Sequence, residues 1–181
     1  MAAEAARYWR HSAVPGVDLL RARFVTHRYG RHSHETYTLA LIESGVEEFD
    51  YGGRLLRAGS GAVALLNPEV VHTGQAGVPD GWSYRVLYPQ VRVVTGIAAE
   101  LGWARGTPDF RDTVIYDARS AAVLRAAHVA AEHGDRLASS SLLSAAVAAL
   151  LSAHAGPARS SARAAPPSSS RRAARTRCWL R

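Results

Sequence analysis

Hydrophobic and polar residues alternate in short runs along the first half of the chain. Between Trp82 and Tyr88 every second residue is aromatic or aliphatic, and residues 17–29 alternate in a similar way. Successive side chains of a β-strand point to opposite faces, so this pattern predicts strands with one buried face. Turn-forming glycines separate the runs, and Gly52-Gly53 predicts a two-residue hairpin. About seven short strands at this close spacing predict a small β-barrel or sandwich.

The region between these two runs contains further short strands. We expect a strand within residues 31–42, then a turn at Glu43-Ser44-Gly45, and a second strand over residues 46–51. Residues 62–66 are entirely apolar, which predicts a short buried strand.

The hydrophobic period changes from two to that of a helix after Pro89. We expect a short helix over residues 91–101, and a second one that begins at the N-cap Asp117 and ends at Gly134. A third is expected to begin at Ser139 and to end at Gly156. Its apolar stripe consists of Leu143, Val147, Leu150, Leu151 and His154. This stripe could close the open side of the barrel or meet a second subunit, and we predict a homodimer.

The two ends of the chain have a different composition from the rest. Residues 1–15 predict an irregular arm in which Tyr8 and Trp9 are the large side chains, and residues 157–181 predict a disordered tail rich in arginine and serine. The expected organisation is therefore an arm over 1–15, a barrel over 16–90, a helical dimerisation segment over 91–156 and a tail over 157–181.

The formal net charge of +7 comes from the tail. Residues 1–156 contain 15 arginines and 15 acidic residues, whereas residues 157–181 contain seven arginines and no acidic residue. The neutral body gives no indication of nucleic-acid binding, although the tail could neutralise phosphates non-specifically. Cys178 is the only cysteine, no signal peptide is evident, and no run approaches a membrane span. We therefore expect a cytoplasmic protein without membrane contact.

Three histidines are the strongest candidates for a binding site. His32 and His34 are two residues apart, so on a strand their side chains share a face. About forty residues later, a strand end with a proline turn at Asn67-Pro68 delivers a third imidazole, His72, and a loop is expected after it. We predict that the three imidazoles converge in one pocket of the barrel. The alternative is that His32 or His34 lies at a strand end and is satisfied by the backbone.

Aromatic residues on the run from Trp82 to Tyr88 would complete such a pocket. Arg85 has the opposite parity to Trp82 and Tyr84, so a regular strand cannot point all three inward, and we expect the aromatic residues to face the ligand. The predicted ligand-binding residues are His32, His34, His72, Trp82 and Tyr84. The other histidines are interpreted as ordinary surface or helix residues: His11, His27, His128, His133 and His154.

These motifs together resemble the ligand-binding cupin domain of AraC-type transcription regulators. The matching pieces are Pro15-Gly16-Val17-Asp18-Leu19-Leu20, Arg31-His32-Ser33-His34, Gly59-Ser60-Gly61, Leu66-Asn67-Pro68, Val71-His72-Thr73-Gly74 and residues 82–88. The resemblance covers about residues 8–155. It implies a jelly-roll-type barrel that senses a sugar or related metabolite, an arm that responds to the ligand, and helices that dimerise.

The same resemblance implies two C-terminal helix-turn-helix units that read DNA. Residues 157–181 stand where these units would begin, so we expect a sensing domain truncated or frameshifted before its DNA-binding part. DNA would then be reached only through a domain that is missing here. We predict no sequence-specific operator binding by this chain, and only salt-sensitive binding through the tail.

Metal-dependent cupin enzymes also resemble the histidine pattern. They carry a carboxylate four or five residues after the second histidine, and here Thr38 and Leu39 occupy those positions. Glu35 would point to the opposite face of a regular strand from His34. We therefore expect no enzyme activity, no cofactor and little tightly bound zinc or iron. The alternative is a metal-dependent isomerase or dioxygenase that uses the three histidines.

Overall fold

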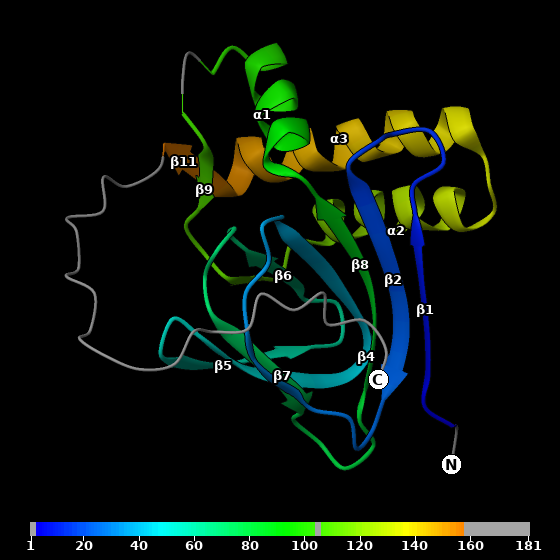
Figure 1. The fold of residues 1–181 in the computed structure, drawn as a ribbon, viewed down its shortest axis with the longest axis vertical. Coiled ribbons are helices and arrows are strands. Elements are labelled where there is room, and N and C mark those ends of the chain that lie inside the picture. Colours follow the sequence, from blue (N-terminus) through cyan, green and yellow to red (C-terminus); the bar gives the residue numbers. More distant parts are fainter. Residues whose placement is uncertain (1–2, 104–105, 158–181) are drawn as a thin grey trace.

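Strand β8 (Trp82–Pro89) lies inside the larger sheet, with strands on both of its edges (Figure 1). The computed structural model describes residues 3–103 and 106–157. The other strands are β1 (Ala5–Arg10), β2 (Val17–Phe24), β3 (Tyr29–His32), β4 (Thr38–Tyr51), β5 (Arg54–Gly59), β6 (Val63–Leu66), β7 (His72–Ala76), β9 (Pro108–Phe110), β10 (Val114–Ile115) and β11 (Ala155–Pro157). The helices are α1 (Val91–Glu100), α2 (Ala118–Glu132) and α3 (Arg136–His154).

The strands form two antiparallel layers that share β4. In the first layer the order is β1-β2-β8-β4-β6-β10. In the second, β5 and β7 pair with the second half of β4, and β3 pairs with β7. The register of β4 against β8 shifts between Ile42 and Ser44, and Gly45 follows with a φ of 72°. This bulge bends β4 from one layer into the other and so closes the small barrel.

The inner strands of the first layer, β8, β6 and the first half of β4, are buried on both faces. Leu39 and Leu87 point outward into a core shared with the helices, and α2 and α3 cover this face (Figure 1). Ala40 and Val86 point inward, into the core between the two layers. A mostly β fold with C-terminal helices and a jelly-roll-type barrel is therefore confirmed. Because one face packs against the helices and the other against the second layer, the inner strands of this layer are apolar on both faces.

The predicted hairpin and helix ends are confirmed where they depend on residues close together in the sequence. Gly52 and Gly53 form the hairpin between β4 and β5 with φ values of 59° and 85°. The Asp117 side chain accepts hydrogen bonds from the backbone N–H groups of Arg119 and Ser120 and so begins α2. Gly134, with a φ of 79°, follows the end of that helix. α3 begins three residues before the predicted Ser139, because the side chain of Asp135 caps it.

Other expectations were wrong. Glu43-Ser44-Gly45 is not a turn between two strands but the bulge within one long strand. The N-terminal arm is not irregular, since β1 pairs along its whole length with β2, from Ala5 opposite Arg23 to Arg10 opposite Asp18. The segment after residue 90 is not only helical. It adds β10 to the first layer beside β6, and β9 pairs with β11.

The apolar stripe of α3 packs within its own chain. Leu143, Val147, Leu150 and Leu151 are each no more than 1% exposed and belong to the core that α2, α3 and the first sheet layer share. The arrangement in which the helices close the barrel's own open side is therefore the one observed. These residues give no support to the predicted dimer, which stays a prediction.

By length and composition alone, α3 could span a membrane. It has 19 residues and a mean hydropathy of 1.5, contrary to the expectation that no run approaches a span. The high value arises because alanine and leucine dominate the helix and Arg136 is its only charged residue apart from His154. The contacts of α3 with α2 and α1 account for its buried side chains, which make up 33% of the apolar window. The predicted disordered tail lies outside the described residues, apart from Pro157.

Candidate functional site

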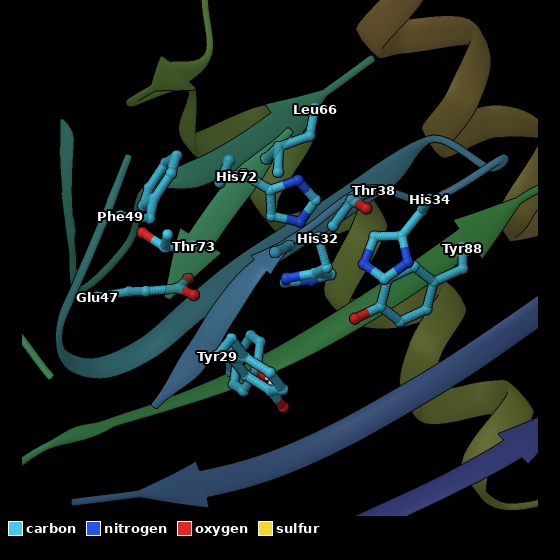
Figure 2. A pocket seen from close by; sticks show the side chains of 13 residues that line it. Tyr29, His32, His34, Thr38, Glu47, Phe49, Leu66, His72, Thr73 and Tyr88 are labelled. Atoms are coloured by element: carbon cyan, nitrogen blue, oxygen red, sulfur yellow. Dashed lines mark hydrogen bonds between the residues drawn. The ribbon is translucent and has the colours of Figure 1, made fainter. Parts of the chain in front are cut away.

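Two of the three histidines are brought together by strand pairing. β3 and β7 are antiparallel neighbours, and their register places His32 directly opposite His72. His34 follows β3 by two residues and joins them from the connection to β4. The ring centroids of His32 and His72 lie 4.3 Å apart, and that of His34 lies 4.9 and 5.1 Å from theirs. Figure 2 shows the three rings gathered in one cavity.

Backbone carbonyls determine which nitrogen of two rings carries the proton. Nδ1 of His32 lies 2.7 Å from the carbonyl oxygen of Gly30, and Nδ1 of His72 lies 2.9 Å from that of Val70. A carbonyl oxygen can only accept, so Nδ1–H is the donor in each case and Nε2 keeps its lone pair. Each of the three histidines offers one ring nitrogen to the cluster, and these nitrogens all lie within 4.8 Å of one another.

Two of the three histidines, His34 and His72, are uncharged at neutral pH. Burial and, to a smaller extent, the neighbouring rings of His72 and His32 together lower the pKa of His34 to about 3. Burial likewise lowers the pKa of His72 to about 4, although its bond to Val70 acts in the opposite direction. Neutral imidazoles with free lone pairs can accept hydrogen bonds or ligate a metal ion.

The cavity around the cluster holds about 500 Å³ of space not filled by atoms, part of it open to solvent. Aromatic residues make up much of its wall, and the hydroxyl groups of Tyr29 and Tyr84 lie 3.1 Å apart. Burial and the neighbouring Tyr29 raise the pKa of Tyr84, which is therefore a neutral phenol. The lining residues are Tyr29, His32, His34, Thr38, Ala40, Glu47, Phe49, Ala64, Leu66, His72, Thr73, Tyr84 and Tyr88.

Glu47, which is not among the predicted site residues, reaches into the cavity with its carboxyl group (Figure 2). Before the bulge in β4, the even-numbered Thr38 and Ala40 face the interior. After it, the odd-numbered Glu47 and Phe49 do. Regular alternation across the Glu43-Ser44-Gly45 segment would place Glu47 outside. The glycine was visible in the sequence, but it was interpreted as a turn. Burial raises the pKa of the Glu47 carboxyl to about 8.

Four of the five predicted site residues line this cavity, and the fifth does not. His32, His34, His72 and Tyr84 are part of the lining. Trp82 is fully buried at the start of β8. The centroid of its ring lies 5.4 Å from that of Phe24 and 5.8 Å from that of Tyr84. Trp82 packs against the ring of Tyr84, which follows it by two residues on the strand, and it does not line the cavity. The role of the other four in binding stays a prediction.

Arg85 points away from the cavity, as the parity of β8 predicted. It is 5% exposed, and its guanidinium donates to Glu43 on β4 and to His128 and Glu132 on α2. His128 is fully buried in this network, so it is more than the ordinary helix residue that we expected. His11 is buried too, and its Nδ1 accepts from the backbone N–H groups of Ala13 and Val14.

Comparison with protein families gives one match, to the AraC-like ligand binding domain, over residues 14–147. Three solved structures are similar over about half of the chain. A conserved protein of unknown function from Streptococcus pyogenes is 15% identical, with 49% of this chain and 75% of that chain covered and a TM-score of 0.42. KdgF from Halomonas sp. is 17% identical, with 47% of this chain and 79% of that chain covered and a TM-score of 0.40. Oxalate decarboxylase from Bacillus subtilis is 16% identical, with 55% of this chain and 33% of that chain covered and a TM-score of 0.42. A search of curated proteins finds no match.

Proposed function

This chain belongs to the AraC-like ligand-binding domain family, and we propose that it binds a small polar molecule in the barrel cavity and acts as the sensing domain of a transcription regulator. The proposed effector is a sugar or a related metabolite. Its hydroxyl groups would donate to the imidazole nitrogens, and its ring would lie against the tyrosines. In this proposal the chain binds its effector without converting it.

Unpaired polar groups in the cavity are the observation that supports this proposal most. Within the described residues, Oγ1 of Thr38 is buried without a hydrogen-bond partner. In addition, none of the described residues forms a hydrogen bond or an ion pair with the half-buried side chain of Glu47. Buried polar groups in proteins nearly always have a partner, and a group left without one costs about 1–3 kcal/mol. A bound polar molecule would supply both partners.

A route from the cavity to the helices supports a sensing role. Tyr84 lines the cavity, while the next residue on β8, Arg85, bonds to His128 and Glu132 on the other side of the sheet. A ligand that moves β8 would therefore also move α2. In a regulator, this motion would pass to a partner subunit and to DNA-binding helices supplied by a C-terminal domain.

The proposal is tested by screening a metabolite library for compounds that raise the thermal unfolding midpoint of the full chain. Ala64 lines the cavity, so Ala64→Leu is expected to abolish the shifts that wild type shows. Thr38→Val, which removes the unpaired hydroxyl with little change of shape, should weaken them. Ala153→Leu, on the exposed face of α3, is the matched control and should keep them. Shifts that persist in Ala64→Leu would place binding elsewhere and contradict the proposal.

A metal-dependent enzyme is the second candidate, and the histidine cluster favours it. The donor set fits a divalent transition metal, because His32 and His72 donate Nδ1–H to the backbone and keep Nε2 free, as metal-bound histidines do. His32, His34 and His72 would hold the ion. When bound, it would polarise a coordinated oxygen of the substrate. Glu47 would be available on the far wall to hold or release a proton.

A further inference from the structure

We infer that the effector carries a protonated amine and that this amine pairs with Glu47. The inference rests on the proposed function, because it assigns the chemical class of the ligand in the same cavity. It separates a cationic amino alcohol or amino sugar from a neutral sugar and from an acid.

The charges around the cavity favour a cation. Glu47 is the only carboxylate among the lining residues, and these include no arginine. The nearest arginine along β8, Arg85, lies on the opposite face and is bound to Glu43 and Glu132. A carboxylate or phosphate ligand would therefore meet Glu47 without a compensating cation from the protein.

The fold makes room for the Glu47 carboxylate at the cavity wall. Gly74 on β7 faces it, and a Cβ on that residue would lie 3.1 Å from Oε1 of Glu47 and 3.1 Å from Cδ2 of Tyr29. These contacts are tighter than side chains normally make, so the glycine leaves space for the carboxylate beside the tyrosine ring. The bulge in β4 turns Glu47 inward, and Gly74 lets it stay there.

An ammonium group satisfies this end of the cavity better than a hydroxyl does. A buried carboxylate without a cation is costly, so the empty cavity favours the neutral carboxyl of Glu47, and only a bound cation stabilises the charged form. Burial raises the pKa of Glu47 to about 8, and a bound cation would lower it again, so that the carboxyl releases its proton as the amine binds. The rings of Tyr29, Phe49 and Tyr84 line the same space and favour a cation over their faces.

At the histidine end of the cavity, a ligand can bind through hydroxyl or N–H donors. Nε2 of His32 and Nε2 of His72 are acceptors, and Thr38 adds an unpaired hydroxyl nearby. Figure 2 shows Glu47 reaching into the cavity from the wall across from His34. A ligand that spans the cavity would thus present an amine to Glu47 and hydroxyl groups to the imidazoles.

Three probes of equal length test this assignment: 4-aminobutan-1-ol, butane-1,4-diol and 4-hydroxybutanoate. Each is titrated into the isotopically labelled full chain, and the amide shifts of cavity residues are followed by NMR. We expect the amino alcohol to bind at least about tenfold more tightly than the diol, because its ammonium group forms a charge-assisted hydrogen bond with Glu47, whereas the hydroxyl of the diol forms a neutral one. The hydroxy acid should give no saturable shift.

Variants at two neighbouring positions locate the preference. Glu47→Gln keeps the shape of the side chain and should bring the amino alcohol to the affinity of the diol. Glu48→Gln is the matched control, because Glu48 lies on the outer face of β4, where it accepts from Gln75 and pairs with Arg57. It should leave the preference unchanged.

The results that would contradict the amine assignment differ from those that would contradict the proposed function. Equal or tighter binding of the diol or the hydroxy acid would overturn the inference and leave a ligand-binding cavity in place. The same holds for a preference that survives Glu47→Gln. If none of the three probes gives a saturable shift of cavity residues, the inference also fails, and the library screen still decides the proposed function.

Discussion

Nη1 of Arg85 lies 3.0 Å from Nδ1 of His128, and this contact fixes the tautomer of a fully buried imidazole. The guanidinium can only donate, so Nδ1 accepts, and Nε2–H donates to the carbonyl oxygen of Leu20 at 3.0 Å. Burial lowers the pKa of His128 to about 4, which keeps the ring neutral. One side chain pair thus links β8 and β2 of the barrel to α2.

Removing Arg85 should destabilise the fold strongly. Arg85→Ala leaves Glu43 and Glu132 at the sheet–helix boundary without their shared cation and leaves His128 without its donor. We expect a loss of about 3 kcal/mol in the free energy of unfolding, the lower part of the range for a broken buried pair. The lower part applies because Arg125 and Arg21 still pair with the two carboxylates.

Urea denaturation of the purified variant measures this loss. Arg57→Ala is the control, since Arg57 pairs with Glu48 at an exposed site, and it should cost less than about 1 kcal/mol. Equal effects of the two substitutions would show that the Arg85 network contributes no more than a surface ion pair.

Leu150→Arg should prevent folding rather than separate subunits. Leu150 is fully buried in the core that α2, α3 and the sheet share, and an arginine there would lack an ionic partner among the described residues. We expect circular dichroism to show loss of the folded state. Leu137→Arg, at a position 78% exposed on the same helix, should fold normally. A folded Leu150→Arg protein with reduced mass by light scattering would restore the dimer interface that the sequence suggested.

Acid should destabilise the chain through its neutral histidines. Their pKa values in the folded state, about 3 for His34 and about 4 for His72, lie below the ordinary value of 6.5. The unfolded chain therefore takes up protons first as the pH falls, and the stability that is complete above 6.5 is lost toward the folded pKa values. His72→Gln should reduce the loss of unfolding free energy between about pH 7 and about pH 5, measured by urea denaturation. An unchanged loss would contradict the burial of this imidazole.

Metal content separates the two candidate functions. A sensor without catalysis predicts little zinc or iron in the purified chain, since Thr38, four residues after His34, is not a carboxylate. Elemental analysis should then give well below one equivalent per chain. One equivalent that is lost in His34→Ala but kept in the His133→Ala control would favour the enzyme instead.

Local chemistry explains how much of this molecule the sequence alone could predict. The hairpin at Gly52-Gly53 and the cap at Asp117 depend on residues within a few positions of each other. The opposite parity of Tyr84 and Arg85 follows from strand geometry on a regular strand. These features were predicted because no distant part of the chain has to be known.

The rest depends on distant partners. Glu43-Ser44-Gly45 has the composition of a turn, and only the continued pairing of β4 with β8 and then with β5 makes it a bulge. That bulge decides that Glu47 faces the cavity, so a regular alternation could not find it. His128 is another case, because its partners Arg85 and Leu20 are 43 and 108 residues away. Nor does anything within residues 5–10 reveal that they pair with the edge of β2.

The most direct test is a crystal structure of the full chain with the strongest compound from the library screen. Our account predicts the compound in the barrel cavity, with hydroxyl groups at His32 and His72 and its amine at Glu47. Density for the compound anywhere else on the chain would contradict it, for example in the surface groove between α2 and α3 that Asp117 and Ser152 line.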